Sequence, residues 1–181
     1  DAAISRELKA VWIIGEDVVQ TDPNSAHVAK AMNSLDLLVV QEIFMSETAK
    51  HADVVLPGTT FLEKDGTFTN TERRVQRVNK AAEPLPGTKP DGLIVTEMMQ
   101  KLGYNQKSYD ADEVLAEIAD VVPFFKGITR KRLGKLGLQW PVKEDGTDTK
   151  ILHEKEFKLG KGKIKYFDWK ESSEIEKNKK D

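Results

Sequence analysis

The sequence predicts an α/β fold built around a parallel sheet. Short apolar runs alternate with segments of helical periodicity, turn-forming or polar residues follow the runs, and no segment is repeated. Apolar runs of this kind are typical of strands that are buried on both faces. The chain has 181 residues, which suffices for one domain of about 100–150 residues with an appendage, or for two small domains.

The first βαβ unit lies at the start of the chain. Residues 11–14 are apolar and Gly15 closes them, so we expect a strand there. Residues 16–35 predict a helix, with a helix-start signature at 22–25 and an apolar stripe after it. Residues 37–40 predict a second buried strand, which ends in Gln41 and Glu42.

Further elements follow at short intervals. Residues 46–50 predict a short helix that Ser46 could cap, and residues 54–56 predict a third strand. Weak alternation indicates short strands or an extended loop over 67–70 and 74–78. Apolar periodicity predicts two more helices, over 92–102 and 112–121.

The composition changes after about residue 140, where polar and lysine-rich sequence replaces the alternating pattern. We therefore predict a domain over 1–140 and an irregular, linker-like extension over 141–181. Within the extension, residues 158–163 predict a glycine turn and residues 165–169 a lone strand.

Composition excludes several classes of function. The formal charge of −2 leaves no global basic field for nucleic acid. Because the chain has no cysteine, it cannot itself ligate an iron–sulphur cluster or a thiolate zinc site. Its three histidines lie far apart, so we expect neither a metal site nor a catalytic residue. The apolar runs are too short to span a membrane, and no signal peptide is visible, so we expect a cytoplasmic protein.

The carboxyl ends of the predicted strands are the places where chemistry is expected, because ligands of open parallel sheets bind there. Glu42 ends the second strand, where dinucleotide-binding folds place a carboxylate that accepts hydrogen bonds from ribose. The glycine-rich phosphate loop of those folds is missing. The alternative is that Glu16, Asp17 and Glu42 are solvated carboxylates.

A charge-dense loop over residues 63–74 is a second candidate. Its cations Lys64, Arg73 and Arg74 could contact a phosphate or pyrophosphate. The alternative is a salt-bridged loop in which Glu63 and Glu72 neutralise these cations. Physical arguments from the sequence do not decide between the two.

Four ordered segments resemble the molybdopterin oxidoreductase family, and within it the catalytic (alpha) subunit of molybdenum- or tungsten-dependent formate dehydrogenases. They are IIGED running on to QTDP (13–17 and 20–23), VVQEIF (39–44), ETA with ADVVLP (47–49 and 52–57), and EKDGTFTNTERRVQ (63–76). The resemblance is strong over residues 10–103 and weaker beyond.

The resemblance implies a Rossmann-like domain that binds part of a bis(molybdopterin guanine dinucleotide) cofactor carrying Mo or W. The cofactor-binding positions that it implies are Gly15, Glu16, Asp17, Thr21, Gln41, Glu42, Gly58, Thr59, Lys64 and Asp91. Which carboxylate takes guanine and which takes ribose stays open. The family's 4Fe-4S ligands and catalytic residues have no counterpart in this segment.

On this resemblance we expect an interior fragment of an oxidoreductase that converts formate to carbon dioxide and passes electrons on. Its partners would be the remaining domains of the parent subunit and electron-transfer subunits, and the fragment alone would be inactive. The alternatives are a structural homologue such as the large iron–sulphur subunit of respiratory complex I, a family member with another substrate, or a generic nucleotide-binding module. Asp17, Thr21 and Asp91 favour the ligand-binding branch.

Overall fold

A computed structural model describes residues 1–169 of the chain. Residues 1–149 form one compact unit, and the described residues 150–169 belong to a second. The strands and α-helices are, in chain order, β1 (Ala10–Ile14), α1 (Val18–Thr21), α2 (Ser25–Met32), β2 (Leu37–Glu42), β3 (Val54–Pro57), β4 (Gly66–Thr69), β5 (Arg74–Val78), α3 (Asp91–Lys101), α4 (Ala111–Val121), α5 (Arg130–Leu133) and β6 (Leu138–Gln139).

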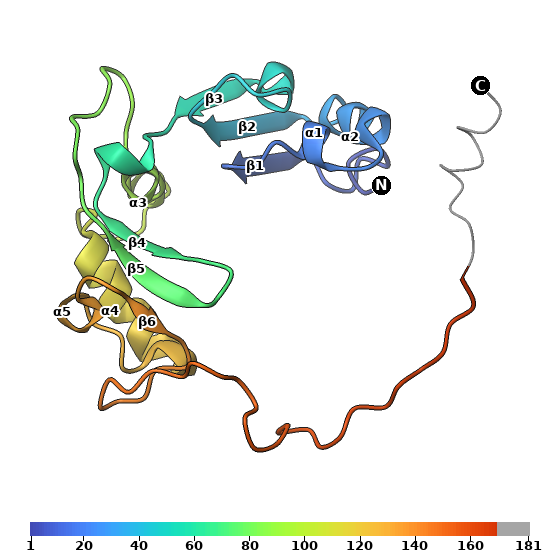
Figure 1. The fold of residues 1–181 in the computed structure, drawn as a ribbon. Coiled ribbons are helices and arrows are strands. Elements are labelled where there is room, and N and C mark those ends of the chain that lie inside the picture. The colour runs from blue at the N-terminus through green and yellow to red at the C-terminus, as the bar shows by residue number, and fades with distance from the viewer. Residues whose placement is uncertain (170–181) are drawn as a thin grey trace. The chain divides into compact units, whose positions relative to one another are not determined.

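The first sheet is parallel, in the order β1-β2-β3 (Figure 1). Its register pairs Trp12 with Val39 and Val40 with Val55. The three predicted strands are therefore confirmed, and β2 runs on through Gln41 and Glu42. The core of this part consists of Leu38 and Val40 of β2 and Ala49, with partly buried side chains from β1, α2 and β3 packed against them.

The second sheet is antiparallel, in the order β4-β5-β6 (Figure 1). Its core consists of Val75, Leu115, Ile128, Leu133 and Val142. Gly137 permits the close approach of β6, because its φ is +75° and a Cβ there would lie 2.3 Å from the carbonyl oxygen of Val75. The α/β class and the parallel sheet are thus confirmed, whereas a Rossmann-like assignment of the whole remains a prediction.

The helices begin close to the predicted positions, but one predicted helix is divided into two. Residues 16–35 hold two helices instead of one, because the chain turns at Asp22 and restarts at Asn24, whose side chain accepts a hydrogen bond from the His27 N–H. The Ser46 hydroxyl accepts a hydrogen bond from the Ala49 N–H, but the helix predicted over 46–50 is a 3₁₀ turn over Ala49–His51 whose N-cap is Thr48.

The C-terminal part differs from the prediction in two respects. Residues 141–149 pack with the first unit, where Val142 is buried, so this unit ends nine residues after the compositional change. The glycine turn is present, with Gly160 at φ +78°. The lone strand predicted over 165–169 was wrong: these residues are exposed and pair with no strand among residues 1–169, and an extended segment without a partner has no ladder of hydrogen bonds. The rest of the predicted extension, 170–181, lies outside the described residues.

Truncating one strand residue tests the position of the first core. We expect Leu38→Ala to lower the free energy of unfolding by about 2–5 kcal/mol, because Leu38 is 1% exposed and the surroundings of a truncated core residue relax only partially. Its neighbour Leu37, 42% exposed, is the matched control, and Leu37→Ala should cost much less. Urea denaturation measures both. Equal losses would contradict the register described above.

Candidate functional site

A pocket of about 480 Å³ lies at the carboxyl ends of the parallel strands. Strand-end residues of β1 and β2 meet residues of the segment after β3 and the first residue of α3 in its lining. The lining residues are Gly15, Gln41, Glu42, Ile43, Phe44, Thr59, Thr60, Phe61, Lys64, Phe68 and Asp91. This is the edge of a parallel sheet at which ligands are expected.

Six of the ten residues predicted from the sequence line this pocket: Gly15, Gln41, Glu42, Thr59, Lys64 and Asp91. The other four, Glu16, Asp17, Thr21 and Gly58, are not among its lining residues. The structure therefore collects most of the predicted positions into one place, although they are spread over 77 positions of sequence numbering between 15 and 91.

Three polar side chains of the pocket lining bond to one another, those of Gln41, Lys64 and Asp91. Lys64 donates to a carboxylate oxygen of Asp91, Oδ2, and to the carbonyl oxygen of Thr59, at 3.1 Å from the latter. Gln41 is fully buried, and its Nε2 donates to Asp91 Oδ1 at 2.8 Å. Burial alone would raise the pKa of Asp91, but the hydrogen bonds from Lys64 and Gln41 and the lysine charge outweigh it and lower that pKa. Asp91 is consequently held as a carboxylate.

Two buried atoms of the pocket residues have no hydrogen-bond partner among the described residues. They are Oε1 of Gln41 and Oγ1 of Thr59. Leaving such atoms unpaired costs free energy, so these two oxygens keep hydrogen-bonding capacity that no group among residues 1–169 uses. Gly58 adds a steric observation, since a Cβ there would lie 3.1 Å from Asp91 Oδ1. A side chain at position 58 would therefore press on the carboxylate.

Glu42 lies at the edge of the same pocket and is half-buried. One carboxylate oxygen accepts a hydrogen bond from the Ile43 N–H at 2.7 Å, and the backbone carbonyl accepts from the Gly58 N–H. The side chain is thus oriented by its own backbone, and its second oxygen remains available to a ligand.

Asp17, which lies outside the lining of this pocket, is held by the loop after β2. Its carboxylate accepts from the hydroxyl and the N–H of Thr48, and from the N–H of Glu47. It therefore joins the loop after β1 to the loop after β2. Glu16 and Thr21 bond to each other at 2.8 Å, outside the pocket.

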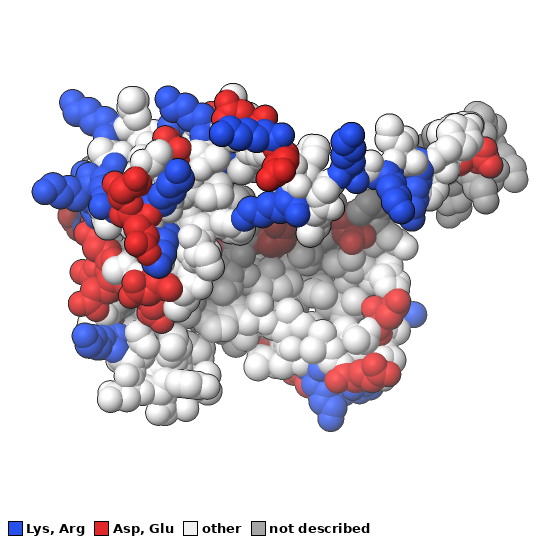
Figure 2. Space-filling view, turned by 90° about the horizontal axis from the view of Figure 1, so that it is seen from below, with Lys and Arg blue, Asp and Glu red and all other residues white. Residues whose placement is uncertain are grey.

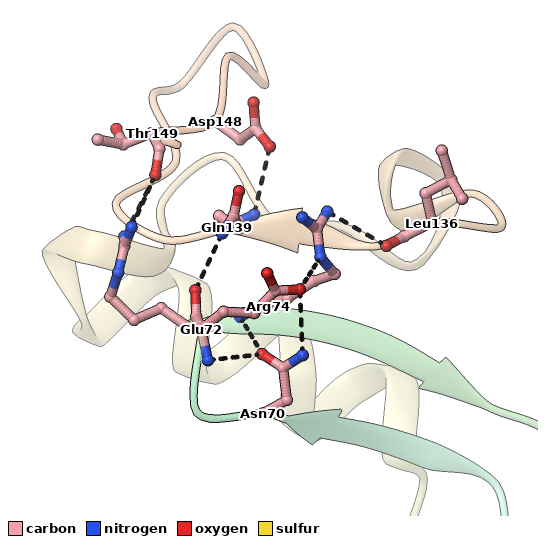
Figure 3. Close-up of polar contacts among 8 residues, drawn as sticks. Asn70, Glu72, Arg74, Leu136, Gln139, Asp148 and Thr149 are labelled. Carbon is pink, nitrogen blue, oxygen red and sulfur yellow. Dashed lines mark hydrogen bonds and ion pairs between the residues drawn. The ribbon is translucent and has the colours of Figure 1, made fainter. Parts of the chain in front are cut away.

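The two arginines of the charged loop do not line the pocket. Arg74 pairs with Glu72 at 2.6 Å, as the salt-bridge alternative required (Figure 3). Arg73 donates to the carbonyl oxygens of Trp140 and Thr149, and its guanidinium lies 5.6 Å from the centre of the Trp140 ring. These contacts fasten residues 139–149 to the β4–β5 turn. Of the three cations, only Lys64 lines the pocket.

Glu63, the other acidic residue of the salt-bridge alternative, accepts hydrogen bonds from Thr60 and Leu85. Its carboxylate accepts from the N–H and the hydroxyl of Thr60 and from the Leu85 N–H. The pKa of Glu63 is lowered, chiefly by the hydrogen bond from the Thr60 backbone N–H. This buried carboxylate closes the turn that carries Thr59 and Thr60 to the pocket.

Sequence reasoning missed the apolar wall of the pocket. Ile43, Phe44, Phe61 and Phe68 line it, and the rings of Phe61 and Phe68 meet edge to face with centroids 6.3 Å apart. Phe44 and Phe61 are 76% and 54% exposed. Large aromatic side chains directly after strand ends, as at position 44, were the available signal.

Charges on the surface are mixed, as the composition predicted. In Figure 2 the basic and acidic side chains of the visible face lie in mixed groups with uncharged surface between them. Among residues 1–169, no group of three or more His, Asp or Glu side chains is arranged to hold a metal ion. In the same range, no helix has the length and apolarity needed to cross a membrane.

Comparisons with known proteins agree on one family. The family model described as molybdopterin oxidoreductase matches residues 1–101. The chain is 46% identical over 175 residues to the F420-dependent formate dehydrogenase subunit alpha of Methanocaldococcus jannaschii, a match that covers 94% of this chain and 26% of that protein. It is 44% identical over 162 residues to a putative formate dehydrogenase of Staphylococcus aureus, covering 89% and 16%.

Two further comparisons extend this result. The probable oxidoreductase YjgC of Bacillus subtilis is 43% identical over 174 residues, covering 94% of this chain and 18% of that protein. Among solved structures, acetylene hydratase from Pelobacter acetylenicus matches with a TM-score of 0.51 and 24% identity, over 56% of this chain and 15% of that one. The likeness to the solved structure concerns the fold alone. The chain spans about a quarter or less of these relatives.

The role of Asp17 predicts a pH dependence of stability. Its pKa is lowered from the ordinary 3.8, first by the Thr48 hydroxyl hydrogen bond, which with the backbone N–H groups outweighs partial burial. The carboxylate therefore stabilises the fold above its unfolded pKa, and this contribution is lost as pH falls through the lower folded pKa. Asp17→Asn should lower the urea midpoint at pH 7, and the difference from wild type should shrink at pH 3. A difference of equal size at both pH values would contradict this assignment.

Proposed function

The chain belongs to the molybdopterin oxidoreductase family, and we propose that its pocket binds the guanosine part of a molybdopterin guanine dinucleotide. The observation that carries the proposal is the convergence of Gln41, Glu42, Lys64 and Asp91 at the carboxyl edge of a parallel sheet. The family implies a molybdopterin cofactor with Mo or W. The guanine dinucleotide form is part of the proposal.

The donor and acceptor chemistry of the pocket fits such a ligand. A guanine edge offers adjacent N–H donors, and a carboxylate accepts two of them. Asp91 is ionised and fixed in position, so it is the base-binding carboxylate in this proposal. Glu42 ends the second strand, where dinucleotide-binding folds place the acid that binds ribose. The unpaired oxygens of Gln41 and Thr59 support a polar ligand.

The apolar wall complements these polar groups. Phe44, Phe61 and Phe68 offer faces or edges against which a flat heterocycle can pack. When bound, the cofactor would supply the redox chemistry through its metal, and this chain would orient and fix its nucleotide end. No residue of the chain is assigned a catalytic step.

For the parent protein we propose the alpha subunit of a formate dehydrogenase that oxidises formate to carbon dioxide. Support comes from the names of relatives 44–46% identical to this chain, which are formate dehydrogenase subunits or putative formate dehydrogenases. Because the chain spans only part of these relatives, the 4Fe-4S cluster, the electron-transfer subunits and a cytoplasmic location belong to the same proposal. Metal analysis of the gene's whole product tests it, and a product with neither metal nor cluster would contradict it.

Guanosine monophosphate tests the pocket directly. We expect it to shift the amide resonances of Gly15, Gln41, Thr59 and Asp91, which line the pocket. The shifts should need millimolar concentration, because we expect this chain to form only one side of the site and to bind weakly. Adenosine monophosphate, which presents an acceptor where guanine presents a donor, is the control and should shift them less. Asp91→Asn should reduce the response to the guanine nucleotide. Equal responses to both nucleotides would contradict a guanine-binding role.

The chain alone should not reduce a dye with formate as donor, because no residue in it is assigned to the reaction. Anaerobic assays with a viologen dye measure this. Calorimetry with guanosine nucleotides is the companion measurement, and a micromolar dissociation constant would contradict the expectation of weak binding.

A further inference from the structure

Lysine residues near nucleotides are usually assigned to phosphate groups, and Lys64 invites that assignment. The charges of the residues that line the pocket argue against a phosphate contact of Lys64. Glu42 and Asp91 are acidic and Lys64 is the one basic residue among the lining residues, so the pocket carries a net negative charge. A phosphate on Lys64 would lie beside the Asp91 carboxylate, in a pocket that Glu42 also lines, and like charges repel.

The contacts of Lys64 also point inward. Its side chain is 23% exposed, and it donates to Asp91 Oδ2 and to the Thr59 carbonyl oxygen. Two of the three ammonium hydrogens are therefore used within the chain. The positive charge is compensated by Asp91 before any ligand arrives.

Asp91 is held from both sides. Lys64 occupies one carboxylate oxygen and Gln41 the other, and Asp91 is the first residue of α3, where the helix dipole favours a negative charge. Each carboxylate oxygen accepts one of these bonds, and because a carboxylate has about four lone-pair sites it keeps accepting capacity for a ligand. The arrangement fixes the direction of the remaining lone pairs without consuming them.

We propose that Lys64 is a positioning residue, which acts on a bound ligand through Asp91, and that the ligand's phosphate groups do not lie on its ammonium group. Gln41 is the second positioning residue of the same carboxylate. The inference rests on the proposed guanosine site. It adds that the pocket reads the base and ribose, and that phosphates lie outside it.

The first test needs no ligand. Carbon-detected NMR follows the Asp91 carboxyl group through a pH titration in wild type, Lys64→Met and Lys50→Met. Lys50 pairs with Glu47 on the surface and is the matched control. The other titratable groups that line pockets with Asp91 are Glu42, Asp65 and Tyr109. We expect the Asp91 pKa to rise in Lys64→Met and to stay unchanged in Lys50→Met. An unmoved Asp91 pKa in Lys64→Met would overturn the proposal.

The second test compares two probes, guanosine and guanosine monophosphate, in NMR titrations. A positioning role predicts that Lys64→Met weakens both by the same factor, about tenfold, because both depend on Asp91. In an Asp91→Asn background, Lys64→Met should then add little further loss. A phosphate contact predicts a larger loss for the monophosphate than for guanosine, and that result would overturn the proposal.

Two controls keep the outcomes separate. If Lys64→Met does not fold, as judged by its amide spectrum, Lys64→Gln replaces it, because the amide keeps a donor for the Thr59 carbonyl and removes the charge. If neither probe binds wild type, the proposed guanosine site fails for this chain, and the carboxyl titration alone decides whether Lys64 positions Asp91.

Discussion

An ion pair between Lys64 and Asp91 joins parts of the chain that are far apart in sequence. Lys64 precedes the β4–β5 hairpin, Asp91 begins α3, and Gln41 at the end of β2 binds the same carboxylate. Three segments are thus tied at one point. If the carboxylate were removed, the lysine and the buried amide would each lose a partner, and a buried polar group without a partner is costly.

The parallel sheet explains why this point lies where it does. Leu38 and Val40 are buried within β2, whereas the next two residues along the strand, Gln41 and Glu42, are polar. Apolar side chains hold the strand in the core, and the change to polar side chains coincides with the edge of the sheet. Gly15, which follows β1, lines the same pocket. Parallel pairing brings the carboxyl ends of β1 and β2 to one edge of the sheet, and the pocket lies at that edge.

Much of this arrangement could be predicted from local sequence, and the remainder depends on long-range contacts. The apolar runs predicted the strands β1, β2 and β3. The rule that ligands bind at the carboxyl ends of parallel strands singled out Glu42 as a candidate. The second sheet was less visible, since β6 has two residues and pairs with β5 across about sixty residues of chain. Arg73 and Arg74 illustrate the same difficulty for the site. Their partners include the carbonyls of Thr149 and Leu136, which no local pattern reveals.

Asp17 and Asp91 show that two predicted site carboxylates can be held by different kinds of hydrogen-bond donor. Both are aspartates at the start of a helix or just before one, and both have a lowered pKa. The Asp17 carboxylate is held by Thr48 and Glu47, so it closes a junction between two loops. The Asp91 carboxylate is held by side chains that themselves line the pocket. The identity of the donors therefore distinguishes the two carboxylates: groups of a neighbouring loop hold Asp17, whereas side chains of the pocket lining hold Asp91.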